Sequence, residues 1–208
     1  MAKITGPLMS LDASGSVAGT IVFSKWKGRN YVRQLVVPAN PKSVKQTSVR
    51  AMMKFLSQQW ASLAATPQGT WSALAAASAH SPFNAFTSAN MSRWASFLTP
   101  TQSYPAANTG TPGTLGVQSA TGGVGQLTIA VSLTAVNDNW GLAIFRDLVT
   151  GFTPSFSNLI GVLAKTTTPS ENYVDTPLAP DTYFYRLLPF TTEGVLGSAF
   201  AEITDTVT

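Results

Sequence analysis

The pattern of hydrophobic and polar positions divides the chain into stretches with different periods. Two runs rich in β-branched and aromatic residues flank the basic segment 25–30. They predict a β-hairpin that joins residues 17–24 to residues 30–37 through a six-residue turn. Pro38 and Pro41 follow and are expected to end the second strand, because proline cannot donate a hydrogen bond to a neighbouring strand.

Three short helices are predicted after the hairpin. The first begins near Ser43 and places apolar side chains at spacings of three and four residues, on one face, at Val49, Met52, Met53, Leu56, Trp60 and Leu63. Thr66-Pro67 and Ser81-Pro82 are typical helix starts, because Thr or Ser caps the free N–H groups and Pro fits the first turn. These two helices extend to about residues 78 and 98. Helices this short need packing on each other, on the hairpin or on a partner.

A linker and a change of period follow. Residues 99–114 hold three Pro, two Gly and no charged residue, a composition typical of a linker. Beyond it, Leu127, Ile129, Val131 and Leu133 alternate within the run 126–133. Further apolar runs lie at 140–145, 159–163, 183–188 and 195–203. Short strands at this spacing predict a β-sandwich.

The segment from Leu178 to Leu187 (LAPDTYFYRL) resembles the turn between strands E and F of fibronectin type III domains. Residues 191–194 and 197–199 are similar to the next turn and last strand of that family. The resemblance covers about residues 113–205 and implies an immunoglobulin-like sandwich in which Trp140 and Tyr185 are core side chains. It implies no ligand.

The charge changes sign along the chain. Residues 1–100 hold ten of the thirteen Lys and Arg and a single acid, Asp12, whereas residues 101–208 hold three Lys or Arg and eight acids. Charged residues make up only 11% of the chain, against about 25% in a typical protein. A surface this poor in charge is covered by small polar residues or by other subunits, so a homo-oligomer or repeated copies in an assembly are expected.

A second resemblance lies in the basic half. Gly15–Phe23, Trp26-Lys27-Gly28, Tyr31-Val32-Arg33, Asn40-Pro41, Gln46 and Arg50, with the later segment 83–90, form a string that is similar to a family of small phage and prophage proteins. The similarity covers about residues 4–98. It implies a place in a virion and does not imply a mechanism.

The candidate chemistry is sparse. The chain has no cysteine and one histidine, His80, and its acids are scattered over predicted turns. We therefore expect no catalytic residue, no metal site and no cofactor. The start of the chain lacks the pattern of a signal peptide, and no apolar stretch is long enough to span a membrane. The expected location is a virion assembled in the host cytoplasm.

The basic residues of the first half, interleaved with two aromatic residues, form the one candidate site. It consists of Lys25, Trp26, Lys27, Arg29, Tyr31, Arg33, Lys45, Arg50 and Lys54. Such a set suits an acidic protein surface, because Arg pairs with carboxylates. It also suits single-stranded nucleic acid, through stacking and phosphate contacts.

These patterns together predict an α+β protein of two domains. Residues 1–98 are a basic hairpin-plus-helices domain, 99–112 a linker, and 113–208 an immunoglobulin-like sandwich. The expected function is that of a non-enzymatic structural protein of a tailed phage. A capsid decoration protein bound to the major capsid protein is expected first, and a tail, neck or baseplate protein second. A nucleic-acid-binding protein and a carbohydrate or host-surface module remain as alternatives.

Overall fold

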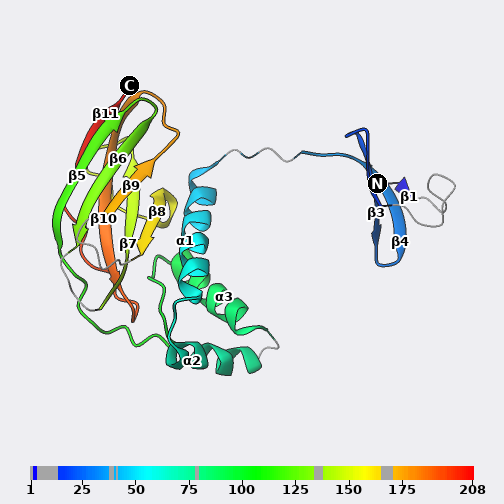
Figure 1. Ribbon diagram of the computed structural model, residues 1–208, viewed down its shortest axis with the longest axis horizontal. Helices are drawn as coiled ribbons and strands as arrows, with labels where there is room; N and C mark the ends of the chain where they lie inside the picture. Colours follow the sequence, from blue (N-terminus) through cyan, green and yellow to red (C-terminus); the bar gives the residue numbers. More distant parts are fainter. Residues whose placement is uncertain are drawn as a thin grey trace. The chain divides into compact units, whose positions relative to one another are not determined.

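The chain forms two compact units, residues 1–41, here the sheet unit, and residues 42–208, here the main unit. The computed structural model describes residues 2–3, 14–37, 40, 42–77, 80–133, 138–164 and 171–208 (Figure 1). The predictions that concern Asp12, Pro38 and Pro41 fall outside the described residues.

The sheet unit is a four-stranded antiparallel sheet with the order β1-β4-β3-β2. Its strands are β1 (Ala2–Lys3), β2 (Gly15–Val17), β3 (Ile21–Trp26) and β4 (Arg29–Gln34). The predicted hairpin is confirmed as the β3–β4 pair. Its turn, however, contains only Lys27 and Gly28, with φ of 48° and 76°. Positive φ at both positions matches a type I′ turn, whose twist suits adjacent strands, so both strands extend further into the basic segment than predicted.

The main unit begins with the three predicted helices. They are α1 (Val44–Trp60), α2 (Ala65–Ala76) and α3 (Pro82–Ala95). The Ser81 cap is confirmed, since its side chain accepts a hydrogen bond from the N–H of Asn84 at 3.2 Å. Thr66 does not cap α2, which begins at Ala65. In α1, Val49 and Met53 are exposed, contrary to the predicted stripe, and Phe55 is buried instead.

Two antiparallel sheets follow. One has the order β5-β6-β9 and consists of β5 (Leu115–Gly123), β6 (Gln126–Leu133) and β9 (Glu171–Asp175). The other has the order β11-β10-β7-β8 and consists of β7 (Asn139–Asp147), β8 (Leu159–Ala164), β10 (Asp181–Thr191) and β11 (Ile203–Val207). Three strands facing four in this order are typical of an immunoglobulin-like sandwich.

The predicted last strand, 195–203, is wrong in position. The structure pairs β10 with residues 203–207, and residues 195–202 follow β10 through single hydrogen bonds such as Phe200 N to Leu187 O. Pro189 lies in this part of β10 and has no N–H to donate, which prevents a regular ladder with the segment beside it.

The inter-sheet core carries the residues that the sequence predicted. Leu127, Ile129, Tyr185 and Leu187 are fully buried in one cluster with Tyr183. The Tyr183 hydroxyl donates to the carbonyl of Ala179 at 3.0 Å. This bond from the start of a strand back to the preceding turn is the tyrosine corner of such sandwiches.

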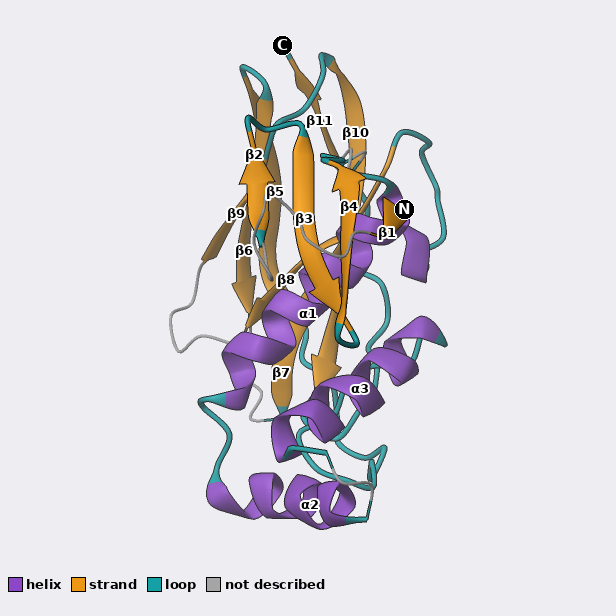
Figure 2. Ribbon diagram, turned by 90° about the vertical axis from the view of Figure 1, so that its right-hand side faces the viewer, coloured by secondary structure: helices purple, strands orange, loops and turns teal. Residues whose placement is uncertain are grey.

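Helices α1 and α3 pack on the outer face of the four-stranded sheet, and α2 packs on α3 (Figure 1, Figure 2). Phe55 of α1, Phe86 and Trp94 of α3, and Phe145 and Phe190 of the sheet belong to one buried cluster. Strands β7 and β10 are therefore apolar on both faces, as is usual for a covered sheet. The predicted division into domains at 99–112 is not confirmed, because helices and sandwich share this cluster.

Trp140 belongs to this helix-facing cluster and not to the inter-sheet core that the sequence predicted for it. Consecutive residues Phe190 and Thr191 of β10 pair with Gly141 and Asn139, so Trp140 is an extra residue in β7. Such a bulge turns a side chain to the other face of the sheet. The indole N–H of Trp140 then donates to Gln59 Oε1 of α1 at 3.1 Å.

The segment predicted as a linker is packed against the helices. The buried Asn90 side chain donates to the carbonyl of Thr101 at 3.0 Å and accepts from its N–H at 2.8 Å. The indole N–H of Trp71 donates to the carbonyl of Gln102 at 2.6 Å. Residues 99–101 are buried, so this part of the chain is fixed in the main unit.

Candidate docking surface

The strand register collects most of the predicted docking residues of the sheet unit on one face. Arg29 pairs with Trp26, Tyr31 with Ser24, and Arg33 with Val22. Directly paired residues of antiparallel strands share a face, and alternate residues along a strand do too. Trp26, Arg29, Tyr31 and Arg33 therefore form one surface, here the cationic face.

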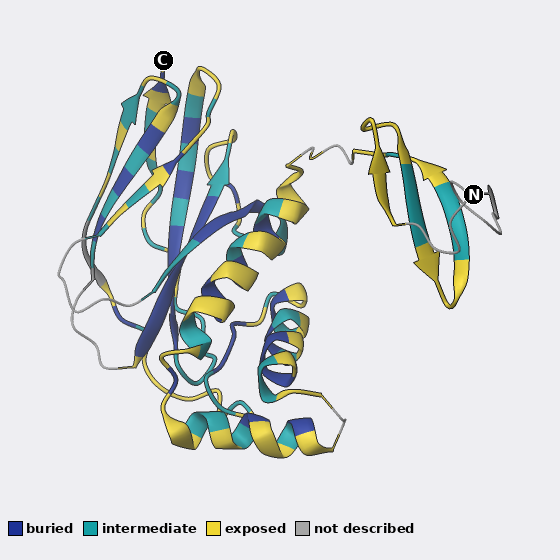
Figure 3. Ribbon diagram, turned by 45° about the vertical axis from the view of Figure 1, so that its right-hand side comes forward, coloured by how far each residue is buried: buried dark blue, intermediate teal, exposed yellow. Residues whose placement is uncertain are grey.

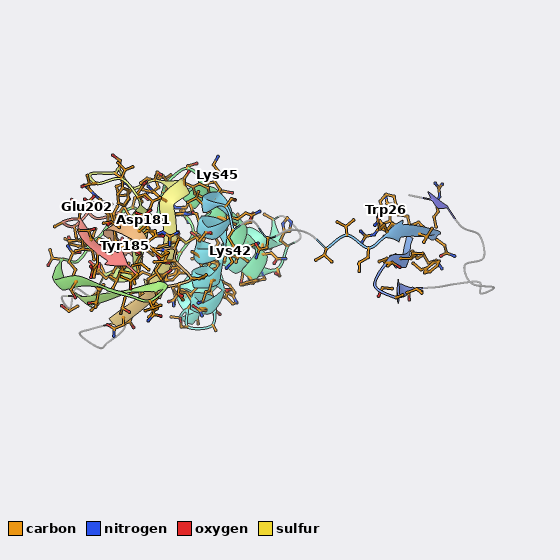
Figure 4. The ribbon with its side chains drawn as sticks, turned by 90° about the horizontal axis from the view of Figure 1, so that it is seen from above. Trp26, Lys42, Lys45, Asp181, Tyr185 and Glu202 are labelled. Carbon is orange, nitrogen blue, oxygen red and sulfur yellow. The ribbon has the colours of Figure 1, made fainter. Side chains whose placement is uncertain are left out.

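Most side chains of the cationic face are exposed, and Tyr31 is half-buried (Figure 4 labels Trp26). Trp26 is 66% exposed, and Arg29 and Arg33 are exposed too. Lys27, in the turn, places its Nζ 5.0 Å from the centroid of the Trp26 ring, within the range of a cation–π contact. An exposed indole flanked by cations is a typical composition for a binding surface.

Lys25 does not belong to the cationic face. It pairs with Asn30 and alternates with Phe23 and Ile21, so it lies at the margin of the opposite face. That opposite face carries apolar side chains, here the apolar face: Val17, Ile21, Phe23 and Val32. The sequence analysis missed this face, although the alternation of Ile21 and Phe23 in β3 was a readable signal.

Lys45, Arg50 and Lys54 lie on α1, in the main unit (Figure 4 labels Lys45). Arg50 and Lys54 line a shallow hollow of about 250 Å³ with Lys42, Thr47 and Ile160, whereas Lys45 is not part of its lining. Of the nine predicted docking residues, six therefore belong to the sheet unit and three to the main unit.

The net charge of the chain belongs to the sheet unit. Residues 1–41 hold five Lys or Arg and one acid, whereas residues 42–208 hold eight Lys or Arg and eight acids. The formal net charge of +4 is therefore concentrated in the smaller unit.

The charged groups of the sandwich hold strands together. Asp175 Oδ2 accepts from Arg146 Nη1 at 2.7 Å and from the hydroxyl of Tyr185 at 3.0 Å. Desolvation and the charge of Asp175 raise the pKa of Tyr185, and the same two causes raise the pKa of Tyr173 to about 12. Because Tyr185 and Asp175 are buried, this cluster joins β7, β9 and β10 within the sandwich.

The described residues contain no group of three His, Cys, Asp or Glu side chains arranged to hold a metal ion. His80 is exposed and lines a groove of about 600 Å³ between the helices, with Met53, Leu74 and Met91. No helix in the described part of the chain has the length and apolar character needed to cross a membrane.

Comparisons with known proteins find solved structures that are similar to the sandwich. No family model and no curated protein matches the chain. Among solved structures, an Fn3-like protein from Clostridium thermocellum is 20% identical with a TM-score of 0.35, over 48% of this chain and 96% of that one. The sensor domain of an anti-sigma factor from Pseudobacteroides cellulosolvens is 12% identical with a TM-score of 0.33, over 48% and 97%.

A β-1,2-glucanase from Parabacteroides distasonis is 12% identical with a TM-score of 0.34, over 47% of this chain. The chain spans only 14% of that enzyme. The strand order and the tyrosine corner, and not these scores, define the sandwich as immunoglobulin-like.

Proposed function

We propose that this protein is a non-enzymatic structural component of a tailed-phage virion, attached to the particle through the cationic face of its sheet unit. The observation that supports this most is the composition of that face. Trp26, Arg29, Tyr31 and Arg33 share one face, on which all but the half-buried Tyr31 are exposed, and the unit that holds this face carries the whole net charge. The main unit, with a core of its own, is the part that is displayed.

A protein surface rich in carboxylates suits the cationic face. Arg29 and Arg33 are four residues apart on β4, with Tyr31 between them on the same side of the sheet, so both guanidinium groups face the same partner surface. Guanidinium groups bind carboxylates with two parallel hydrogen bonds, and an adjacent aromatic ring supplies contact area at little entropic cost. The resemblance of the first half to phage proteins supports a virion as the source of that surface.

The major capsid protein is the first proposed partner, which makes the chain a decoration protein. A tail, neck or baseplate protein is the second. The experiment starts with particles produced by the genome that carries the gene. Heads and tails are separated on a gradient, and the chain is quantified in each by immunoblotting; enrichment with heads supports decoration, and enrichment with tails supports the second partner.

Two substitutions of equal charge test the cationic face. Arg33→Gln and Gln34→Glu each lower the net charge by one, on neighbouring residues that lie on opposite faces of β4. Arg33→Gln is expected to reduce incorporation into particles, and the double variant Arg29→Gln with Arg33→Gln is expected to reduce it further. Gln34→Glu is expected to leave incorporation near that of the wild type. Absence of the wild-type chain from purified particles contradicts the virion proposal. Equal incorporation of all variants contradicts the role of the cationic face.

Single-stranded nucleic acid is the second candidate partner, because the aromatic rings lie on the same face as the arginines. Its test is the binding of a labelled oligonucleotide followed by fluorescence anisotropy at several salt concentrations. Binding through phosphates would make log K fall with log salt by about 0.7 for each phosphate contacted. This candidate is favoured if log K falls steeply with log salt, if Arg33→Gln makes that dependence weaker, and if the chain is absent from particles.

A further inference from the structure

The sheet unit has a second surface that the proposed function does not use. On the apolar face, Phe23 pairs with Val32 across the two central strands, and Val17 pairs with Ile21 beside them. Val17 is 47% exposed and Ile21 43% exposed, and Phe23 and Val32 are half-buried. Four apolar side chains therefore form one contiguous patch on one side of the sheet.

Within the described residues 14–37, the sheet unit is a single layer of strands. No side chain of residues 14–37 is buried, and the ribbon of these residues in Figure 3 is coloured as exposed or intermediate. A single sheet is stable when an apolar face is covered by another sheet or by a helix. The apolar face is thus the side on which a covering layer must pack.

We infer that the apolar face packs against the same face of a second copy of this chain, so that two sheet units form a small β-sandwich. This inference does not rest on the proposed function. The distribution of charge between the two faces carries it. Arg29 and Arg33 lie on the far side, so packing through the apolar face buries no arginine and keeps both cationic faces in solvent.

The positions of the polar residues at the margins fit a twofold arrangement. Lys25 lies at the turn end of the apolar face, and Gln34 lies at the other end of the same face, opposite Ile21. A twofold axis perpendicular to the strands brings Lys25 of one copy near Gln34 of the other, and the two lysines stay apart. A patch that is apolar at its centre and avoids like charges at its margins is self-complementary, as a twofold interface requires.

The pairing of two sheet units also determines where the two cationic faces lie. In a sandwich of two sheets, the cationic faces of the two copies point in opposite directions. One assembled pair then presents two binding surfaces, each free to contact a different partner molecule.

The first test measures the mass of the full chain by light scattering coupled to size exclusion, over a series of concentrations. The wild type is expected to have the mass of two chains at the higher concentrations. Phe23→Lys is expected to return it to the mass of one chain, and Val22→Lys, the neighbouring substitution on the cationic face, to leave the pair intact. A wild type with the mass of one chain throughout overturns the inference.

The second test remains informative if a lysine unfolds the sheet unit. The natural chain has no cysteine, so single cysteines report contacts without background. Val32→Cys is expected to be joined rapidly by a short bis-maleimide, because Val32 lies in the central pair of the apolar face. Arg33→Cys, one residue away on the other face, is expected to react with the reagent without joining two chains. Equal cross-linking at the two positions overturns the inference, whatever the incorporation into particles shows.

Discussion

The ring of Phe55 in α1 meets the ring of Trp140 in β7 edge-on, with 5.1 Å between the ring centroids. The contact joins the helical layer to the sandwich, and Phe190 of β10 completes it at 5.5 Å from Phe55. Because Phe55 and Trp140 are both buried, the helices and the sandwich are expected to unfold in one transition.

The first prediction concerns this contact. Phe55→Ala should lower the free energy of unfolding of the main unit by about 3–5 kcal/mol, because it leaves a cavity under a fully packed ring. Chemical denaturation followed by tryptophan fluorescence and by circular dichroism should show one shared transition for helices and strands. The exposed Val49→Ala is the control and should change stability by less than about 0.5 kcal/mol. Two separate transitions would support a domain boundary at 99–112 instead.

The second prediction concerns the segment predicted as a linker. Asn90→Ala removes two hydrogen bonds that fix Thr101 and leaves a buried carbonyl and N–H unpaired. The expected loss is about 1–3 kcal/mol for such buried groups. Limited proteolysis should then cut within residues 99–112 in the variant and spare the wild type. Cleavage of the wild type at the same rate would show that this segment is a linker after all.

The third prediction concerns the buried cluster around Asp175. Tyr185→Phe removes the hydroxyl that donates to Asp175 and should cost about 1–3 kcal/mol, whereas Tyr185→Ala, which also empties ring volume, should cost about 3–5 kcal/mol. Thermal or chemical denaturation measures both. The matched control is Tyr104→Phe, because Tyr104 is 45% exposed. Equal losses for Tyr104→Phe and Tyr185→Phe would contradict the structural role of the hydroxyl.

The fourth prediction concerns alkaline pH. The folded state raises the pKa of Tyr173 to about 12 and raises that of Tyr185 further from the ordinary value of 10.0. Above that ordinary value the unfolded chain loses protons that the folded chain keeps. The stability that these tyrosines contribute is therefore complete below pH 10 and declines as the pH rises above it, by up to about 1.4 kcal/mol per pH unit for each tyrosine.

Denaturant titrations at a series of alkaline pH values test this prediction. The double variant Tyr173→Phe with Tyr185→Phe should show a shallower decline than the wild type, although it is less stable at neutral pH. An unchanged slope would mean that other groups cause the alkaline loss.

The sequence predicted the elements of the fold well where local signals were strong. Ser81-Pro82 marked the start of α3, because capping and a proline in the first turn act within a few residues. Alternation at Leu127, Ile129 and Val131 predicted the bounds of β6, and the corner around Tyr183 predicted the sandwich. For the candidate site, the sequence named Trp26, Arg29, Tyr31 and Arg33. The last three alternate along β4, and the pairing of β3 with β4 places Trp26 beside Arg29 on the same face.

Only the tertiary structure decided how these elements combine. The composition of residues 99–114 indicated a linker, but the hydrogen bonds to Thr101 and Gln102 come from side chains of α3 and α2, which local composition does not encode. The bulge that turns Trp140 toward Phe55 depends on the register of β7 against β10. The sequence by itself therefore determined helices, strands and the excess of positive charge, because these depend on neighbouring residues. The structure decided which faces are covered and where the units divide, because burial depends on contacts between residues far apart in the chain.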